Sequence, residues 1–165
     1  MKVVGIDPGT ARLGFALIEG NRRAPVLTEV ELITTPINLS PAHRLHILST
    51  ALSQRLERIH PDGVAVEKIY FARNSKTAIA VAEARGVILL AAGQAGLKLV
   101  EFTPTQVKKR VVGVGHASKR QIQEMTQHQC KLAILPSEDA ADALALCLSY
   151  AVEHDRLHTR ESSRR

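Results

Sequence analysis

Four carboxylates in this chain stand where they could hold a metal ion together. Asp7 ends the first apolar run, and Glu67 stands near the end of a later one, "DGVAVEKI". Asp139 and Asp142 are three residues apart in "PSEDAADALALCLSYA", so they share one face of a helix. Clustered carboxylates without His or Cys beside them suit hard cations such as Mg²⁺ or Mn²⁺. Carboxylates of this kind beside a basic surface predict metal-assisted phosphodiester hydrolysis. Two ions would activate a water molecule and neutralise the charge on the leaving oxygen.

Local structure offers a simpler explanation for some of these acids. Asp7 precedes Pro8-Gly9, so it could serve only to shape an ordinary turn. Asp139 follows a potential cap at Ser137, and an acid in a first helical turn is favourable by itself. Asp142 differs because it is set among Ala and Leu residues of an apolar helix, where an unpaired carboxylate costs several kcal/mol. A metal ion, an Arg partner or a wet edge would each remove that cost.

Basic residues are concentrated in two segments of the chain. The formal net charge is +6, and the tail at residues 156–165 carries four Arg and one Glu. Residues 104–123 contain no acid and five basic residues, which are Lys108, Lys109, Arg110, Lys119 and Arg120. A basic block on a near-neutral body predicts contact with a polyanion. A solvated loop and an unstructured tail would have the same composition.

The apolar runs and turn signals predict an α/β domain. Strands are expected at residues 3–7, 13–18, 25–35, 62–69 and 97–102. Helices are expected to begin at Pro41, near Asn74, within "TPTQVKKRVVG", at Ser118 and at Pro136-Ser137. The order predicts a mixed five-stranded sheet, with three antiparallel strands followed by parallel ones, flanked by helices.

This topology would bring the first two acids together. Helical crossovers would make the first and fourth strands parallel neighbours, so Asp7 and Glu67 would emerge at one sheet edge. Sheets of this kind bind ligands at the carboxyl ends of their parallel strands.

Length and composition limit the remaining possibilities. With 165 residues, 45% of them apolar, the chain can bury a core, and we expect one domain at residues 1–155 with a basic, unstructured tail at 156–165. We expect no signal peptide and no membrane span, because no apolar stretch reaches about 18 residues. Cys130 and Cys147 lack CxxC spacing, which favours a reduced, cytoplasmic protein. His154 and His158 have no third ligand nearby in the sequence, so we expect no zinc site.

Several motifs together resemble one bacterial family. "GIDPGTARLGFALIE", "VAVEKIYFARNSKTA" with "ARGVILLAA", "TPTQVKKRVVGVGHASKRQIQ" and "EDAADALALC" resemble the RuvC family of Holliday-junction endonucleases, in the same order, from about Lys2 to Tyr150. The resemblance implies a ribonuclease H-like fold, a homodimer, and divalent-metal cleavage of two like-polarity strands of four-way junction DNA in recombination and repair. It also implies work alongside the RuvA and RuvB branch-migration proteins in the cytoplasm.

The resemblance also implies roles for individual residues. The catalytic and metal-binding acids of the family match Asp7, Glu67, Asp139 and Asp142, with two Mg²⁺ or Mn²⁺ ions per site. Lysines that the family uses near the cut phosphate match Lys108 and Lys119. The family usually has Phe where this chain has Tyr70, which can also stack on bases, although Phe71 could do so instead. The remaining DNA-binding residues that we expect are Arg73, Asn74, Lys76, Lys109 and Arg120.

A stripe of small residues at helical spacing is consistent with a dimer: Ala78, Ala82 and Gly86. The stripe would allow close approach of a second copy, but packing against its own sheet would explain it equally well.

Three other classes of protein remain as alternatives. A phosphotransferase of the sugar-kinase and actin type shares the strand–Asp-x-Gly-Thr–strand loop, but it needs two lobes and this chain has one. A non-catalytic protein that binds branched DNA would have no use for four acids near a phosphate. A tyrosine recombinase would use Tyr70 or Tyr150 as nucleophile, leaving the acids without a role, and Tyr150 is better explained as a core residue. We therefore expect a junction-resolving endonuclease.

Overall fold

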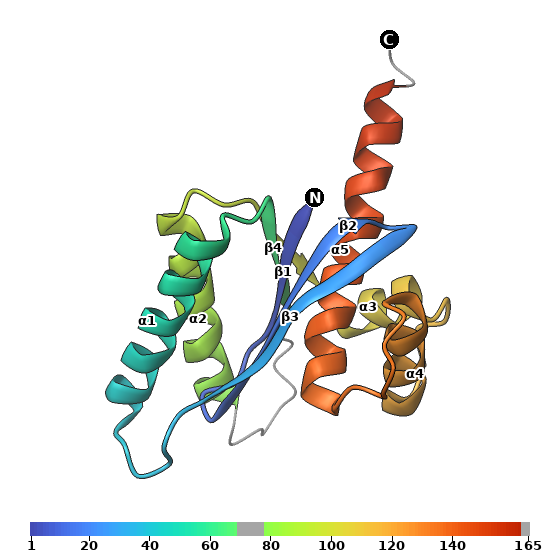
Figure 1. Ribbon diagram of the computed structural model, residues 1–165. Coiled ribbons are helices and arrows are strands. Elements are labelled where there is room, and N and C mark those ends of the chain that lie inside the picture. Colours follow the sequence, from blue (N-terminus) through green and yellow to red (C-terminus); the bar gives the residue numbers. More distant parts are fainter. Residues whose placement is uncertain (69–77, 163–165) are drawn as a thin grey trace.

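The computed structural model describes residues 1–68 and 78–162, with side chains up to Asp155, and it contains a five-stranded mixed sheet (Figure 1). The strand order is β3-β2-β1-β4-β5, in which β1, β2 and β3 are antiparallel and β4 and β5 run parallel to β1. The strands are β1 (Lys2–Asp7), β2 (Arg12–Asn21), β3 (Ala24–Thr34), β4 (Gly63–Glu67) and β5 (Leu99–Phe102). The mixed sheet expected from the sequence is confirmed.

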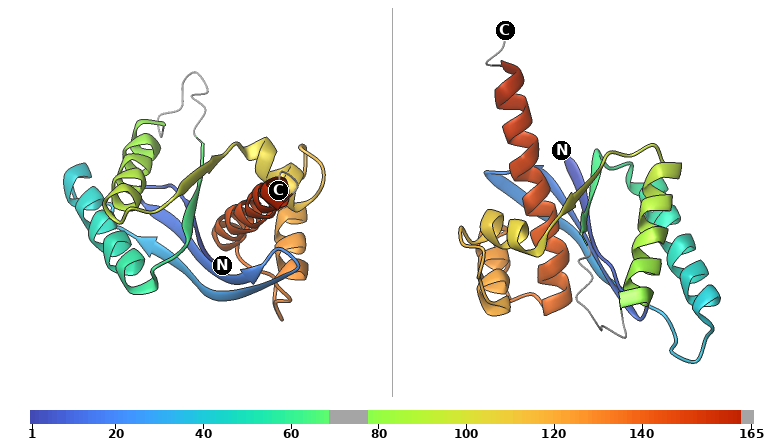
Figure 2. Two further views of the ribbon diagram at one scale, coloured as in Figure 1. Left: turned by 90° about the horizontal axis from the view of Figure 1, so that it is seen from above. Right: turned by 180° about the vertical axis from the view of Figure 1, so that it is seen from behind.

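Helices cover both faces of this sheet (Figure 2). One face packs against α1 (Pro41–Ile59) and α2 (Ala78–Gln94). The other packs against α5 (Glu138–Ser162), which α3 (Pro104–Val111) and α4 (Lys119–Gln129) flank in turn. The backbone of α5 is helical to Ser162, so the helix includes most of the basic segment at residues 156–165. No helix in the described part of the chain is long and apolar enough to span a membrane.

The alternation of side chains along β1 decides which residues meet which helices. Val4 and Ile6 are buried with the leucines of α1. Val3 is buried with the residues of α5 on the opposite face. Since successive side chains of a strand point to opposite faces, Gly5 and Asp7 lie on the same side as Val3. The last residue of β1 therefore faces α5.

Helix α1 begins and ends where its sequence signals predict. The side-chain oxygen of Ser40 accepts a hydrogen bond from the backbone N–H of His43, and Pro41 is the first helical residue. The buried stripe consists of Leu48, Leu52, Leu56 and Ile59. This stripe attaches α1 to the sheet and to α2.

Helix α5 approaches the sheet at two glycines. A Cβ atom on Gly5 would overlap the carbonyl oxygen of Ala143, and one on Gly14 would lie 2.9 Å from that of Asp139. Further along, the Cys147 thiol lies 3.4 Å from the carbonyl oxygen of Ala16 and donates to it. Direct contact between the backbones of α5 and the strands thus fixes where the first turn of α5 lies on the sheet.

Candidate active site

Asp7 and Glu67 end two neighbouring parallel strands. Ile6 pairs with Val66 in the register of β1 and β4, and the two acids are the next residues along. In β4, Ala65 is buried on the α5 side, so Glu67, two residues on, faces the same way as Asp7. Parallel strands lie about 4.8 Å apart, so both carboxylates reach the same point beneath α5.

The first two turns of α5 bring two further acids to this edge. Ser137 precedes the helix, and its side-chain oxygen lies 3.4 Å from the backbone N–H of Ala140, which donates to it. The absence of a side chain at Gly14 lets the first turn lie against β2. Asp142, one turn further on, then reaches the ends of β1 and β4.

These elements enclose a pocket of about 250 Å³. Three of the four acids line it, and α3 and α4 each contribute one lysine to its wall. Its residues are Asp7, Glu67, Asp142, Lys108, Lys119, Pro104, Val107, Ile122 and Leu146. Carboxylates that are far apart in the sequence therefore share one pocket with the two lysines implied by the family resemblance.

The carboxylates of this pocket hold their protons more tightly than usual. Burial, followed by the charges of Asp142, Glu67 and Asp139, raises the pKa of Asp7 from 3.8 to about 7. Burial is also the largest cause of the raised pKa values of Glu67 and Asp142. Lys108 lowers the pKa of both, and Lys119 lowers those of Asp7 and Asp142, but neither lysine outweighs burial. The pocket therefore holds negative charge that its own residues do not fully compensate.

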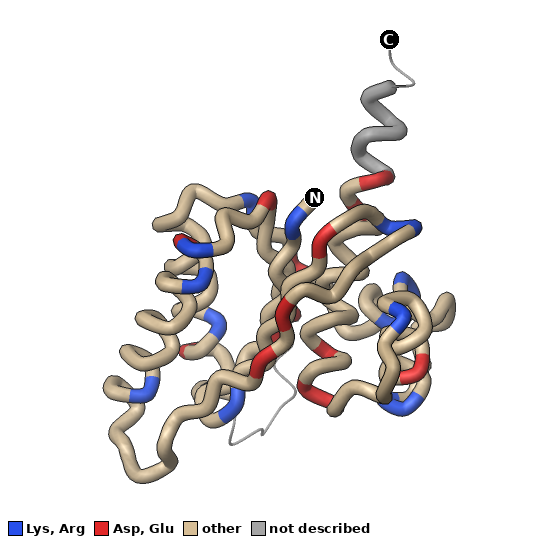
Figure 3. Tube along the Cα trace, in the orientation of Figure 1, with Lys and Arg blue, Asp and Glu red and all other residues tan. Residues whose placement is uncertain are grey.

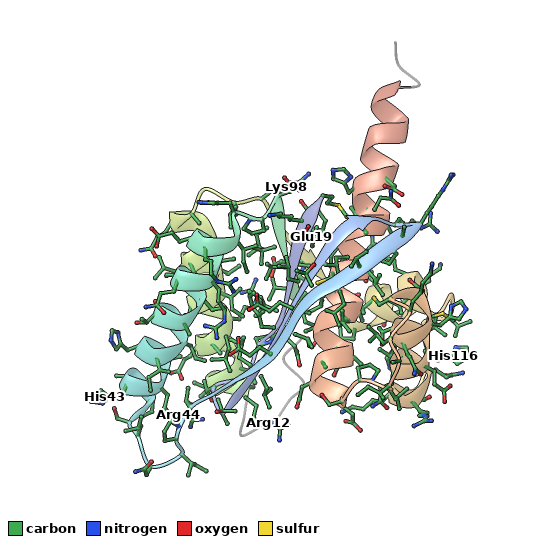
Figure 4. The ribbon with its side chains drawn as sticks, viewed as in Figure 1. Arg12, Glu19, His43, Arg44, Lys98 and His116 are labelled. Atoms are coloured by element: carbon green, nitrogen blue, oxygen red, sulfur yellow. The ribbon has the colours of Figure 1, made fainter. Side chains whose placement is uncertain are left out.

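Asp139 does not line the pocket, because it has another partner. Its carboxylate accepts a hydrogen bond from the guanidinium of Arg12, the first residue of β2, which lies at the lower edge of the sheet in Figure 4. The neighbouring Glu138 is held by Lys119, whose ammonium nitrogen lies 2.6 Å from the Glu138 carboxylate. Of the four acids expected to form one site, the structure thus brings three into the pocket and leaves Asp139 beside it. Asp139 acts on Asp7 only through its charge.

The donor set of the pocket fits a hard divalent cation. All its acidic groups are carboxylates, and a cation beside them would relieve the repulsion that raises the pKa of Asp7. Among the residues that the structure describes, no three His, Cys, Asp or Glu side chains form a ready-made metal site. One physical reason is the ion pair between Arg12 and Asp139, which engages the Asp139 carboxylate.

The other residues predicted to bind DNA lie apart from the pocket or outside the description. Lys109 is exposed on another side of α3, where it lines a different groove. Arg120 forms an ion pair with Glu124 one turn along α4, at 2.7 Å. The residues that lie outside the described part of the chain are Tyr70, Phe71, Arg73, Asn74 and Lys76.

The structure adds a network that sequence reasoning missed, which holds the turn after Asp7. The side-chain hydroxyl of Thr35 donates to the carbonyl oxygen of Thr10 at 2.6 Å. Arg44 in α1 donates from Nε to that hydroxyl at 2.8 Å. The contacts join residues 25 and 9 positions apart in the sequence, so no local motif could have indicated them. Arg12 was missed as well, since its partner lies 127 positions away.

The fold and the pocket define a nuclease-type site on a ribonuclease H-like α/β domain, with carboxylates at strand ends and lysines beside them. Residues 3–150 match the sequence model of the family described as crossover junction endodeoxyribonuclease RuvC. The chain therefore belongs to the RuvC family.

Curated relatives and solved structures agree with this assignment. The chain is 46% identical over 151 residues to a RuvC from Thermomicrobium roseum, which covers 91% of this chain and 92% of the relative. It is 44% identical over 152 residues to a RuvC from Chloroflexus aggregans, with 92% and 93% covered. The structure is similar to Thermus thermophilus RuvC in complex with a Holliday junction substrate, with a TM-score of 0.88 at 32% identity over 93% of this chain and 94% of that one.

Proposed function

We propose that this chain is a structure-selective endonuclease that resolves four-way (Holliday) DNA junctions. It would do so by paired, metal-dependent phosphodiester hydrolysis in two strands of like polarity, during recombination and repair. The observation that carries the proposal is the pocket in which Asp7, Glu67 and Asp142 meet Lys108 and Lys119. Membership of the RuvC family and likeness to a RuvC bound to a Holliday junction support it.

Each group in the pocket has a role that follows from its charge. Bound Mg²⁺ or Mn²⁺, two ions per site, would supply an activated water and neutralise charge on the leaving oxygen. Asp7, Glu67 and Asp142 would hold the ions from the strand ends and from α5. Asp139 would complete the set after leaving Arg12. Without the cations, these carboxylates would repel a phosphodiester.

Lys108 and Lys119 would bind the phosphate that is cut. They stand on α3 and α4 respectively, on the pocket wall, so they would hold the phosphodiester from two helices. Further along the DNA, Tyr70 would stack on a base, with Arg73, Asn74 and Lys76 holding phosphates. These four residues are carried over from the sequence motifs alone.

A homodimer would place two such pockets on two strands of one junction. Helix α2 offers the surface for it, because two large apolar side chains stand on its exposed side: Ile79 is 72% exposed and Leu90 56% exposed. A Cβ atom on Gly86 of the small-residue stripe would meet no described residue within 4 Å, so the stripe does not pack against the chain's own sheet at that position. A two-fold axis beside α2 would bury these side chains and make the cuts symmetric. We further propose a cytoplasmic enzyme that works with RuvA and RuvB.

The test uses a labelled synthetic four-way junction and a linear duplex of the same sequence. Each is incubated with the protein and Mg²⁺, Mn²⁺ or chelator, beside the Asp7→Asn variant. We expect paired, metal-dependent nicks in the junction alone. The variant should lose cleavage by more than about 100-fold and keep binding, because the lost group holds metal and not DNA.

Each other outcome has a definite meaning. Tight junction binding without cleavage under either metal would replace the proposal with a non-catalytic protein that binds branched DNA. Equal cutting of both substrates would retain the nuclease and overturn its selectivity for junctions. Loss of binding in Asp7→Asn would overturn the metal-holding role of this residue.

A further inference from the structure

A second groove, of about 360 Å³, lies on another side of α3 from the acidic pocket. It is formed by the β2–β3 hairpin, α3 and the middle of α5. Its lining residues are Arg22, Gln106, Lys109, Arg110, Gly113 and Val152. Figure 3 shows Lys and Arg at the tip of the hairpin and on the α3–α4 part of the molecule.

Two cations of this groove form no ion pair with a described residue. Arg22, in the hairpin turn, and Lys109, on α3, are both exposed, and no carboxylate within the described ranges lies within ion-pair distance of either. Other arginines of the molecule are paired with an acid: Arg55 with Glu31 and Arg58 with Glu29 are examples. The groove therefore has positive charge available for a ligand.

Arg110 makes the inner wall of the groove rigid. Its guanidinium pairs with Glu153 of α5 and lies over the Phe102 ring of β5, 4.6 Å from the ring centre. These contacts neutralise its charge and tie α3 to the sheet and to α5. Gln106 adds an amide to the same wall. A ligand would thus meet two unpaired cations and a neutral polar group on a fixed support.

The position of this groove relative to the acidic pocket suits a continuous DNA strand. Lys108 and Lys109 are consecutive on α3, so their side chains leave the helix about 100° apart, one towards the acids and one towards the groove. The two sites thus lie on adjacent sides of α3, next to each other along the surface. The groove extends from there towards the hairpin tip, and the ten residues of β2 span roughly 30 Å from the acidic edge to that tip.

We propose that this groove binds the phosphodiester backbone of a junction arm, a few nucleotides from the phosphate that is cut. The inference rests on the proposed function, because the backbone is that of the DNA substrate. Arg22 and Lys109 each contact a phosphate oxygen, and they position the arm without taking part in hydrolysis. Neither residue lines the acidic pocket, so their contribution is to binding alone.

The test measures junction binding in chelator, where hydrolysis is prevented. The variants are Arg22→Gln and Lys109→Gln, alone and together. The matched control is Arg23→Gln, which removes the same charge from the same hairpin turn at a position that does not line the groove. Thermal melting of each variant checks that the fold is retained. Single phosphates along one arm are then replaced in turn by neutral methylphosphonates, and each substituted junction is titrated with each variant.

We expect the salt dependence of binding to weaken by about 0.9 in logarithmic slope for each phosphate that the Arg22 or Lys109 variant no longer holds. At one or two neighbouring positions, the neutral phosphate should weaken binding by the wild-type chain several-fold and leave the double variant unaffected. Such non-additivity would identify the interacting pair, since only groups that interact are coupled.

Two results would overturn the proposal that the groove binds a junction arm. One is a double variant that responds to every neutral phosphate as the wild-type chain does. The other is an Arg23→Gln effect as large as that of Arg22→Gln, which would indicate attraction by overall charge and no contact in the groove. Failure of the wild-type chain to bind the junction would instead overturn the proposed function.

Discussion

Arg12 forms an ion pair with Asp139, and this pair joins the first residue of β2 to the first turn of α5. One of the four acids implied by the family resemblance is thereby engaged by a cation of the chain itself. Because the Arg12 side chain is 62% exposed, separating the pair costs little free energy. A metal ion and Arg12 would therefore compete for the same carboxylate.

Replacement of Arg12 should make the site easier to load with metal. We expect Arg12→Gln to change the free energy of unfolding without metal by less than about 1 kcal/mol, because the ion pair is exposed. The Mg²⁺ or Mn²⁺ concentration for half-maximal thermal stabilisation should fall, because Asp139 is released. Arg55→Gln, which breaks the Arg55–Glu31 pair on the sheet edge, is the control and should leave the metal midpoint unchanged. An unchanged midpoint in Arg12→Gln would contradict the competition.

The raised pKa of Asp7 predicts how stability depends on pH in the absence of metal. In the folded chain the pKa of Asp7 is about 7, against 3.8 ordinarily, so the folded state binds more protons than the unfolded state between these values. Stability should therefore fall as pH rises from about 4 to about 7, and stay low above that. The Asp7→Asn chain should be more stable than wild type at about pH 8 by roughly 2–4 kcal/mol.

Urea denaturation in chelator, from about pH 5 to pH 8, measures this difference. The pH dependence of Asp7→Asn should be shallower but not absent, because Glu67 and Asp142 also have raised pKa values. Saturating Mg²⁺ should remove most of the wild-type loss above pH 7. Parallel curves for the two chains in chelator would contradict the assignment of the pKa near 7 to Asp7.

Much of the fold could be predicted because its signals are local. Ser40, Thr103 and Ser118 were recognisable as caps or helix starts, and the structure places each of them at an N-cap. The apolar run of β1 and the crossover to β4 were enough to predict that Asp7 and Glu67 meet at one sheet edge. Tyr150 is buried as expected of a core residue.

What could not be predicted depends on contacts between distant segments. Asp139 and Asp142 share a helix face by spacing, yet only the tertiary structure shows that Arg12 holds the first of them. Composition alone does not distinguish Lys108 from Lys109 in the basic block; the resemblance assigned Lys108 to the cut phosphate, but the second groove that Lys109 lines depends on the orientation of α3 on the sheet. The small-residue stripe on α2 had two explanations, and at Gly86 no described residue lies within 4 Å of a Cβ, which disfavours packing within the chain at that position.

Lys119 should contribute to phosphate binding more than to stability. Its ammonium group is 70% exposed and is held by Glu138 at 2.6 Å, so its loss should cost less than about 1 kcal/mol in the free energy of unfolding. Lys119→Ala should lower the cleavage rate on the order of 100-fold, because a charge facing the phosphodiester is removed. It should also lower the logarithmic salt slope of junction binding by about 0.9. Arg58→Ala, which removes an exposed cation that is likewise paired with a glutamate but lies on α1, should do neither; an equal slope change in both would contradict a specific phosphate contact at Lys119.

The closeness of α5 to the sheet predicts that Gly5 tolerates no side chain. A Cβ atom there would overlap the carbonyl oxygen of Ala143 and lie 2.7 Å from Sγ of Cys147, so α5 would have to move outward. We expect Gly5→Ala to lower the free energy of unfolding by more than about 2 kcal/mol and to reduce cleavage, since Asp142 moves with the helix. Gly93→Ala is the matched control, because no described residue lies within 4 Å of a Cβ there and a helical Gly→Ala change gains up to about 1 kcal/mol.

A second substitution tests whether the helix backbone is the obstacle. Cys147→Ala in the Gly5→Ala chain removes the thiol overlap but leaves the Ala143 carbonyl oxygen in place. The double variant should therefore regain little stability, as measured by urea denaturation. Full recovery would show that the thiol alone restricts Gly5, and that α5 is not fixed by contact between its backbone and β1.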